Sequence, residues 1–287
     1  MFSSLDTGAI GIRDHNLEQA LALAQRCGYG GVDFSISEAA QLADAHGIDW
    51  LRELFARHEA RPGNWGLPVD WEGDGWEAEV EQLPALAQVA QQLGALRTTT
   101  WCPSHSPTRD FDENFEWHRV RYRRIAETLL PYDVRLGFEF IGPKTFPPPG
   151  DYLFINDMPG MLRLCEAVGT DNVGLLLDAY HLFTSGGSMS DLDSLSEKDV
   201  VAVHVNDAPE GLTLETYMDL DRRLPTETGV IDLAGFMQRL DAMGYAGPVT
   251  CEPFSARTNA IEDPYEAAQL VVTHMQRMWQ QAGLVWA

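Results

Sequence analysis

Short apolar segments alternate with longer amphipathic segments along almost the whole chain. The short segments are rich in β-branched and aromatic residues, a pattern that indicates buried strands. We predict strands at residues 1–11, 30–36, 61–67, 96–101, 135–142, 172–178, 200–206 and 247–253. Between the strands, apolar residues recur at the spacing of a helix, and we predict helices at 16–29, 49–60, 76–95, 115–130, 157–168, 233–245 and 263–283.

The alternation repeats about eight times and contains no linker, internal repeat or low-complexity break. This order predicts an α/β protein with a single (β/α)8 TIM barrel that spans residues 1–287 as one domain. A doubly wound sheet is the alternative, but it would normally carry a glycine-rich phosphate turn after an early strand. The glycines of "CGYGGVD" precede the strand at 30–36 instead of following it, so the barrel is favoured.

Composition narrows the class of protein. The formal net charge of −23 argues against nucleic acid or an anionic membrane as a partner, because binding phosphates requires a surface of lysine and arginine. The chain shows neither a signal peptide nor an apolar run long enough to cross a bilayer. Four scattered cysteines without C-x-x-C spacing fit a reduced compartment. Together these features predict a cytoplasmic protein.

Four successive strands of the second half end on side chains that bind metals. Because catalytic groups of a TIM barrel gather at the carboxyl ends of its strands, these side chains are expected to meet. Three carboxylates and one imidazole suit a divalent cation with open positions for substrate oxygens, with Mn2+ favoured and Co2+, Zn2+ or Mg2+ as alternatives. The predicted ligands are Glu139, Asp178, His204 and Glu252.

Each of these residues has a purely structural alternative when taken alone. A strand histidine such as His204 is more often a hydrogen-bonded core residue, Glu139 fits an internal ion pair, and Glu252 precedes Pro253 at a strand end. The combination favours a cation, because three buried carboxylates without one would raise each other's pKa and destabilise the fold. We therefore expect Asp178, at the end of the apolar run "VGLLLD", to face a metal.

Several further residues are candidates for substrate contacts. His181 lies three positions after Asp178, where a neutral imidazole could hydrogen-bond a substrate hydroxyl or carbonyl, or simply begin a helix. Trp65 and Trp101 would form apolar walls or pack in the core. Lys144 either reaches the mouth or faces water, and either of Arg222 and Arg223 could bind an oxygen-rich substrate. The candidate substrate-binding residues are His181, Arg222, Lys144, Trp101 and Asp207, which follows His204.

The segments that carry these residues resemble a known family. Glu139 together with "LLLDAYH", "VVAVHVND" and "GPVTCEPF" is similar to the xylose-isomerase-like TIM-barrel superfamily of sugar isomerases and epimerases. From Asp178 onward, "DAYHLFTSGG", "DRRLPTETGVIDL" and "GYAGPVTCE" resemble the inosose (2-keto-myo-inositol) isomerase group. The first half of the chain agrees only in its alternating pattern. Thr226 stands where that group usually has a glycine, so the sequence of this loop departs from the family pattern.

The resemblance implies a metal-dependent isomerase or epimerase of a small polyol ketone or ketose. It implies that Glu139, Asp178, His204 and Glu252 bind the metal, that Glu139 and Glu252 also form the acid/base pair, and that His181 contacts substrate. The expected reaction passes through a cis-enediolate formed when a proton leaves the carbon beside the carbonyl. The resemblance also implies a homodimer or homotetramer.

Two other functions stay open at this stage. A dehydratase or lyase acting on a keto-polyol of the inosose or dehydroshikimate type would use the same enolate and expel a β-hydroxyl. A metal-stabilised barrel subunit without turnover is the other. The DNA-repair branch of the superfamily, represented by endonuclease IV, is disfavoured because it requires additional histidines and a basic face, which this acidic chain lacks.

Overall fold

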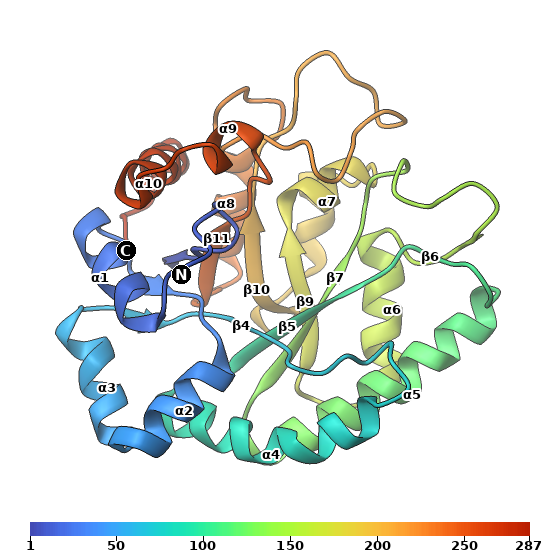
Figure 1. The fold of residues 1–287 in the computed structure, drawn as a ribbon. Coiled ribbons are helices and arrows are strands. Elements are labelled where there is room, and N and C mark those ends of the chain that lie inside the picture. Colours follow the sequence, from blue (N-terminus) through green and yellow to red (C-terminus); the bar gives the residue numbers. More distant parts are fainter.

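The computed structural model describes residues 1–287 and shows nine parallel strands in one sheet surrounded by helices (Figure 1). The order of strands in the sheet is β3-β2-β1-β11-β10-β9-β7-β5-β4. These strands are β1 (Phe2–Leu5), β2 (Gly31–Val32), β3 (Arg61–Pro62), β4 (Trp65–Gly66), β5 (Arg97–Cys102), β7 (Arg135–Phe140), β9 (Val173–Asp178), β10 (Val200–Val205) and β11 (Pro248–Cys251).

The two edge strands of this sheet are consecutive parts of one interrupted strand. β3 pairs with β2, β4 pairs with β5, and only Gly63 and Asn64 separate β3 from β4. At the interruption, the backbone N–H of Asn64 donates to the side chain of Asp33 instead of to a neighbouring strand. The chain therefore joins both edges, and eight strand positions close into a ring. The predicted (β/α)8 barrel is confirmed.

Helices cover the outside of this ring (Figure 1). Helix α1 shows the local signals: Asn16 caps its first turn, and Gly28 ends it at φ +81°, a conformation that glycine adopts without strain. The helices are α1 (Leu17–Cys27), α2 (Ile36–His46), α3 (Ile48–Arg57), α4 (Trp76–Leu93), α5 (Phe111–Leu129), α6 (Met158–Val168), α7 (Ala179–Thr184), α8 (Leu233–Ala242), α9 (Ala256–Asn259) and α10 (Pro264–Ala282). No helix is both long enough and apolar enough to cross a membrane.

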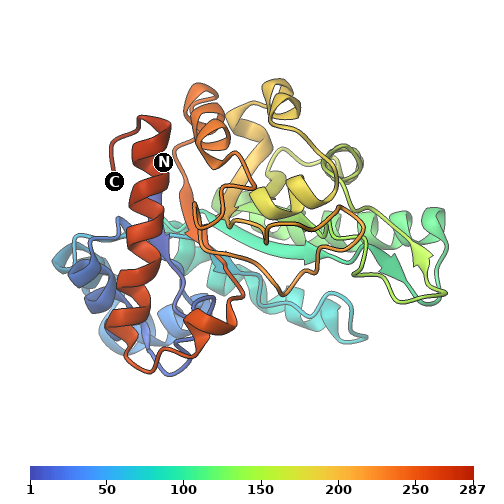
Figure 2. The ribbon, with the colours of Figure 1, turned by 90° about the horizontal axis from the view of Figure 1, so that it is seen from above.

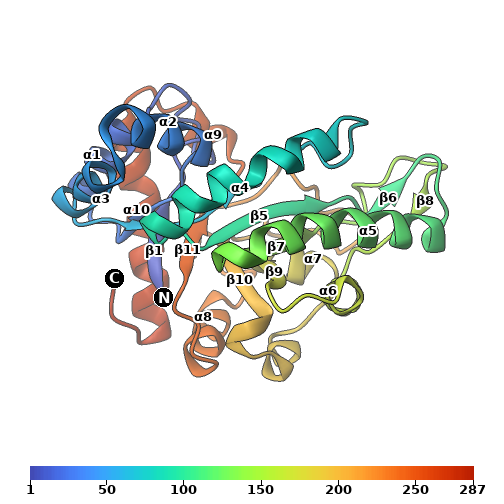
Figure 3. The same cartoon turned by 90° about the horizontal axis from the view of Figure 1, so that it is seen from below.

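The structure differs from the sequence prediction mainly in the first half. Helix α2 was not predicted, because only Ile36 and Ala39 of its residues are buried and its amphipathic pattern is correspondingly weak. The predicted strand at 61–67 is broken in two. A short antiparallel pair, β6 (His105–Ser106) with β8 (Tyr152–Leu153), also lies outside the predicted elements, at the end of the molecule away from both termini (Figure 3).

The second half of the sheet follows the predicted strands closely. Every residue of β10 is buried, and β9 is buried except at its half-buried first residue, as expected of parallel strands covered on both faces. His204 of β10 lies opposite Asp178 of β9, and Trp101 of β5 lies opposite Glu139 of β7. The carboxyl ends of these strands therefore meet at one end of the barrel. The connection after β10, drawn in orange, crosses this end (Figure 2).

Candidate metal centre and active-site cavity

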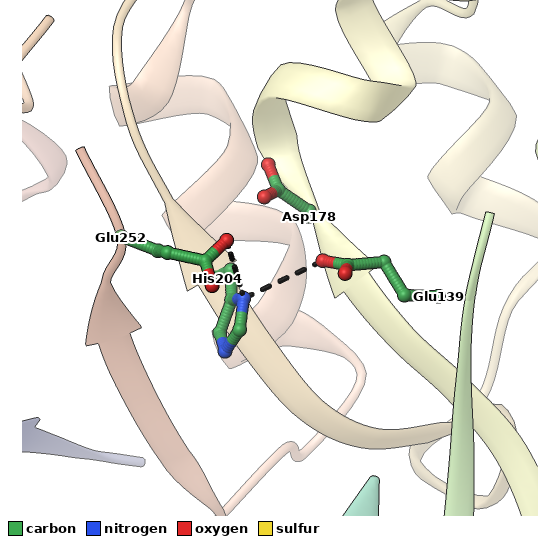
Figure 4. Close-up of side chains that lie close together, drawn as sticks. All are labelled: Glu139, Asp178, His204 and Glu252. Carbon is green, nitrogen blue, oxygen red and sulfur yellow. Dashed lines mark ion pairs between the residues drawn. The ribbon is translucent and has the colours of Figure 1, made fainter. Parts of the chain in front are cut away.

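Four side chains converge where the strands of the second half end. Glu139 is the penultimate residue of β7, Asp178 the last of β9, His204 the penultimate of β10, and Glu252 follows β11 directly. One ligand atom from each residue lies within 4.8 Å of the other three (Figure 4). The structure thus brings together all four residues that the sequence predicted as a metal set.

The imidazole of His204 lies between two of the carboxylates. Its Nδ1 atom is 3.4 Å from Oε1 of Glu139 and 3.4 Å from Oε2 of Glu252 (Figure 4). These contacts are longer than good charge-assisted hydrogen bonds. Accordingly, His204 Nδ1 and Glu139 Oε1 are buried without a hydrogen-bond partner, which is costly for polar atoms. A cation bound between the side chains would satisfy both atoms.

The close approach of these groups shifts their pKa values. Burial raises the pKa of Glu139 above its usual value, although His204 opposes the shift. For Glu252, burial also favours the neutral form, but His204 and Arg222 outweigh burial and hold its pKa below the usual value. Burial disfavours the imidazolium of His204, yet Glu252 and Glu139 raise its pKa well above the ordinary range. The site thus holds strongly interacting acids and bases.

Arg222 supplies the positive charge that is nearest to Asp178. Its Nη1 donates to Asp178 Oδ2 at 2.8 Å and to Glu252 Oε2 at 3.1 Å, and its Nη2 donates to Asp219 Oδ1 at 2.8 Å. The guanidinium is 1% exposed and lies between the rings of Tyr180 and Phe254. Burial disfavours its charge, but Asp178 and its acidic neighbours raise the pKa of Arg222 above its usual value.

Asp178 is therefore already paired before any metal binds, which sequence reasoning did not predict. Its Oδ1 accepts hydrogen bonds from the backbone N–H groups of Tyr180 and His181 and so caps helix α7, while Oδ2 faces Arg222. Burial opposes ionisation of this carboxyl, but Arg222 and the two histidines hold its pKa below the usual value. Oδ2 also accepts a longer hydrogen bond from Asn206 Nδ2 at 3.4 Å, and a cation that ligates Oδ2 would replace this bond while Arg222 stays paired.

His181 is fully buried and is fixed by the backbone of the preceding strand connection. Its Nδ1 accepts a hydrogen bond from the N–H of Gly142 at 3.2 Å, which places the proton of a neutral imidazole on Nε2. Nη2 of Arg222 lies 3.2 Å from Nε2, but it donates to Asp219. Nε2 also lies 4.0 Å from Glu139 Oε1 and 3.7 Å from Asp219 Oδ1, on the side of the cavity. The Nε2–H of His181 therefore lies on the side of the cavity that Glu139 and Asp219 also line.

Gly142→Ala is expected to displace His181 and lower the free energy of unfolding by about 1–3 kcal/mol. A Cβ at position 142 would lie 2.2 Å from the carbonyl oxygen of His181 and 2.7 Å from Oγ1 of Thr184, so the backbone must move. Urea unfolding measures the loss. Gly75→Ala is the control, because its added Cβ meets no atom within 4 Å. If both variants and wild type are equally stable, Gly142 and the backbone of His181 are not packed tightly enough to exclude a Cβ atom.

Of the remaining residues considered for substrate contacts, some line the cavity and others lie outside it. Trp101 is 41% exposed and lines the cavity, whereas Trp65 is buried and its indole donates to the carbonyl of Ala95. Lys144 lies outside the cavity lining, and its Nζ pairs with Glu215. Arg223 pairs with the exposed Asp221, so of the two adjacent arginines only Arg222 points inward.

Asp207 is buried and organises a loop instead of lining the cavity. Its carboxylate accepts hydrogen bonds from the backbone N–H groups of Ala208, Thr228, Gly229 and Ile231, at 2.7–3.1 Å. Its backbone forms a two-bonded bridge with Arg223, next to Arg222. In the same loop, Thr226 adopts φ +63°, the left-handed conformation that suits the glycine usual in the resembling family.

Glu139, His204 and Glu252 line a cavity of about 590 Å3, a size suited to a small molecule, whereas Asp178 is not part of the lining. Apart from Trp101, the part of its wall that comes from the first half of the chain was not predicted. Asp6 follows β1, Asp33 follows β2, and Asn64 and Thr99 are linked by a 2.7 Å hydrogen bond. The available signal was a polar residue directly after each short strand, as at "SSLD" and "GGVD".

Comparison with known proteins finds relatives that are similar over most of the chain. The sequence is 22% identical over 248 residues to the inosose isomerase of Bacillus velezensis, covering 85% of each chain. A xylose isomerase domain protein from Alicyclobacillus acidocaldarius superposes with a TM-score of 0.84 at 29% identity, covering 98% of this chain and 99% of the other. The crystal structure of the IolI protein with a bound zinc atom gives a TM-score of 0.77 at 20% identity, covering 99% and 98%.

The family model for the xylose isomerase-like TIM barrel matches residues 21–276, which is most of the chain. The match includes all four convergent residues and both halves of the cavity except the segments before residue 21, around Asp6 and Leu17. It therefore covers the first half as well, where the sequence resemblance was limited to the alternating pattern. The chain belongs to the xylose isomerase-like TIM barrel family.

Proposed function

We propose that this protein is a divalent-metal-dependent isomerase or epimerase of a small polyol ketone or ketose of the inosose type. The observation that carries the proposal is the convergence of Glu139, Asp178, His204 and Glu252 at one end of a small-molecule cavity. The similarity to an inosose isomerase over most of both chains supports the same class of reaction.

The four side chains fit a divalent cation. Three carboxylate oxygens and one imidazole nitrogen form a donor set of intermediate hardness, and two of these buried atoms have no hydrogen-bond partner in the protein. The zinc atom in the IolI structure supports a divalent metal in this fold, and we propose Mn2+ for this chain. When bound, such a cation polarises a carbonyl oxygen and an adjacent hydroxyl, which makes the intervening C–H more acidic.

The residues around the proposed metal set provide the remaining functions. Glu139 and Glu252 lie on opposite sides of His204, so one carboxylate can remove the proton beside the carbonyl and either can return it (Figure 4). The Nε2–H of His181 can donate to a substrate oxygen, and Trp101 forms one apolar wall. Return of the proton to the neighbouring carbon gives isomerisation, and return to the opposite face gives epimerisation.

The test is proton exchange in D2O. The protein with Mn2+ is incubated with 2-keto-myo-inositol and, separately, with a ketohexose. Each reaction is then quenched, the metal is removed, and the products are examined by NMR. We expect deuterium at the carbon beside the carbonyl and a new isomer or epimer. A new ultraviolet enone band would instead identify a dehydratase. If no tested ketone undergoes either exchange or dehydration, the result contradicts an enzymatic role.

Metal affinity is expected to increase with pH. Glu252 and Glu139 raise the pKa of His204 in the metal-free protein, so a proton competes with the cation for this imidazole near neutral pH. Below the pKa of His204, affinity for Mn2+ should fall about tenfold for each unit of pH, and binding should release a proton. Titration calorimetry in buffers of different ionisation enthalpy measures both effects. Equal affinity at pH 6 and pH 8 would contradict His204 as a ligand.

A further inference from the structure

The cavity is lined by far more acidic than basic groups. Arg222 is the only lysine or arginine in the lining. Asp178 lies outside the lining and accepts a hydrogen bond from Arg222. The carboxylic residues that line the cavity are Asp6, Asp33, Glu38, Glu139, Asp219 and Glu252. Even with a bound divalent cation, carboxyl groups outnumber the positive charges around a substrate.

Arg222 is not available to neutralise an anionic substrate. Its Nε donates to the backbone oxygen of Asp219, and its two terminal nitrogens donate to Asp178, Glu252 and the side chain of Asp219. Each nitrogen of the guanidinium is therefore already paired with a protein oxygen, in a position that is 1% exposed. A substrate carboxylate or phosphate would have to break these ion pairs to gain a bidentate contact.

The wall formed by the first strands presents an open acceptor next to the proposed metal set, because β1, which Asp6 follows, pairs with β11, which Glu252 follows. Asp33 is fully engaged: its Oδ1 accepts from Ser4 Oγ and from the N–H of Asn64, and its Oδ2 accepts from Thr250 Oγ1. Asp6 accepts at Oδ1 from the N–H of Ala9, while no protein group donates to its Oδ2. A carboxylate oxygen of this kind accepts a hydrogen bond from a hydroxyl and repels another anion.

The local field already acts against negative charge before a substrate binds. Burial, together with the neighbouring carboxylates of Asp33 and Glu252, raises the pKa of Asp6 to about 6. The same field that disfavours ionisation of Asp6 disfavours an anionic group placed beside it.

We propose that this cavity selects uncharged polyhydroxy ketones and rejects their carboxylate- or phosphate-bearing counterparts, with Asp6 Oδ2 accepting a substrate hydroxyl at the strand end next to that of Glu252. This inference rests on the proposed function and specifies its substrate class. It separates uncharged inososes and ketoses from acids of the dehydroshikimate type. The excess of carboxylates sets the discrimination, because the one arginine of the wall is already paired and no lysine is present to compensate it.

The experiment compares ligands that differ mainly in charge. Titration calorimetry of the Mn2+-loaded protein measures binding of 2-keto-myo-inositol, of D-fructose, and of D-fructuronate, which carries a carboxylate in place of the terminal CH2OH of fructose. We expect D-fructuronate to bind at least about tenfold more weakly than D-fructose, because its carboxylate is repelled by the carboxylates that line the cavity. Asp6→Asn keeps the shape of the side chain and removes its charge. In this variant, the ratio of the Kd for D-fructuronate to the Kd for D-fructose should fall at least about threefold.

Glu53→Gln is the matched control, since Glu53 is exposed on α3 and does not line the cavity. Its ratio should equal that of wild type. Binding of D-fructuronate equal to or tighter than D-fructose, while the neutral ketones bind and exchange their protons, would overturn the charge selection and leave the proposed function intact. Absence of binding and exchange for every ketone would overturn the proposed function and this inference with it. A ratio unchanged in Asp6→Asn would remove Asp6 from the proposal.

Discussion

Replacing Glu252 by glutamine is expected to reduce kcat for ketone isomerisation or epimerisation by about 10²–10⁴-fold, the usual contribution of a positioned acid or base. The glutamine amide would keep the size of the side chain and lose the ability to take up a proton. The same change removes one anionic ligand from the set of four, so the affinity for Mn2+ should fall as well. Activity is therefore measured at saturating Mn2+, and metal content is determined separately.

Glu262→Gln is the control for this variant. Glu262 is exposed ten residues farther along the chain and lines no part of the cavity, so its loss should change neither kcat nor metal content. A loss of metal affinity in Glu252→Gln with normal kcat at saturating Mn2+ would identify Glu252 as a ligand only. Wild-type activity together with wild-type metal affinity would remove Glu252 from the site altogether.

Arg222→Met is expected to destabilise the metal-free protein by about 3–5 kcal/mol, the usual cost of removing one partner from a buried ion pair. Methionine preserves much of the apolar contact with Tyr180 and Phe254 but leaves Asp178 without its 2.8 Å partner. Urea unfolding in the presence of a chelator measures this loss. Added Mn2+ should recover part of it, because a divalent cation supplies the missing positive charge beside the carboxylates.

The neighbouring residue provides a matched control. Arg223 carries the same side chain, but it is about one-third exposed and pairs with the exposed Asp221. Arg223→Met should therefore change the free energy of unfolding by less than about 1 kcal/mol. If both variants lose the same stability, the buried network around Arg222 is not what stabilises this end of the barrel. If Arg222→Met alone is destabilised and Mn2+ has no effect, the cation does not bind beside Asp178.

The barrel was predictable because its strands in the second half are nearly continuous apolar runs. Parallel strands covered on both faces leave only their ends for polar residues, so Asp178 after "VGLLL" and His204 within "VVAVHV" identify both the strands and the site. The first half gives a weaker signal. β2, β3 and β4 have two residues each, and the interruption at Gly63 and Asn64 replaces strand pairing by a side-chain contact with Asp33.

Partners that are distant in sequence could not be assigned from local pattern. Arg222 and Asp178 are 44 residues apart, and Arg222 and Arg223 are equivalent as sequence, yet only Arg222 points inward. Asp207 looked like a substrate contact because it follows His204, but three of its four backbone hydrogen bonds come from a loop that begins about twenty residues later. Lys144 lies in a connection whose course places it beside Glu215.

By itself, the sequence determined the class of fold, the order of its elements and the four side chains that meet at the strand ends, because periodic burial and strand polarity are local properties of the chain. Tertiary structure alone decided which basic side chain pairs with Asp178, which residues form the acidic wall around Asp6, and which of the two arginines enters the cavity. Those outcomes depend on how loops pack across the end of the barrel, where charge and hydrogen bonding act between residues that no sequence period relates.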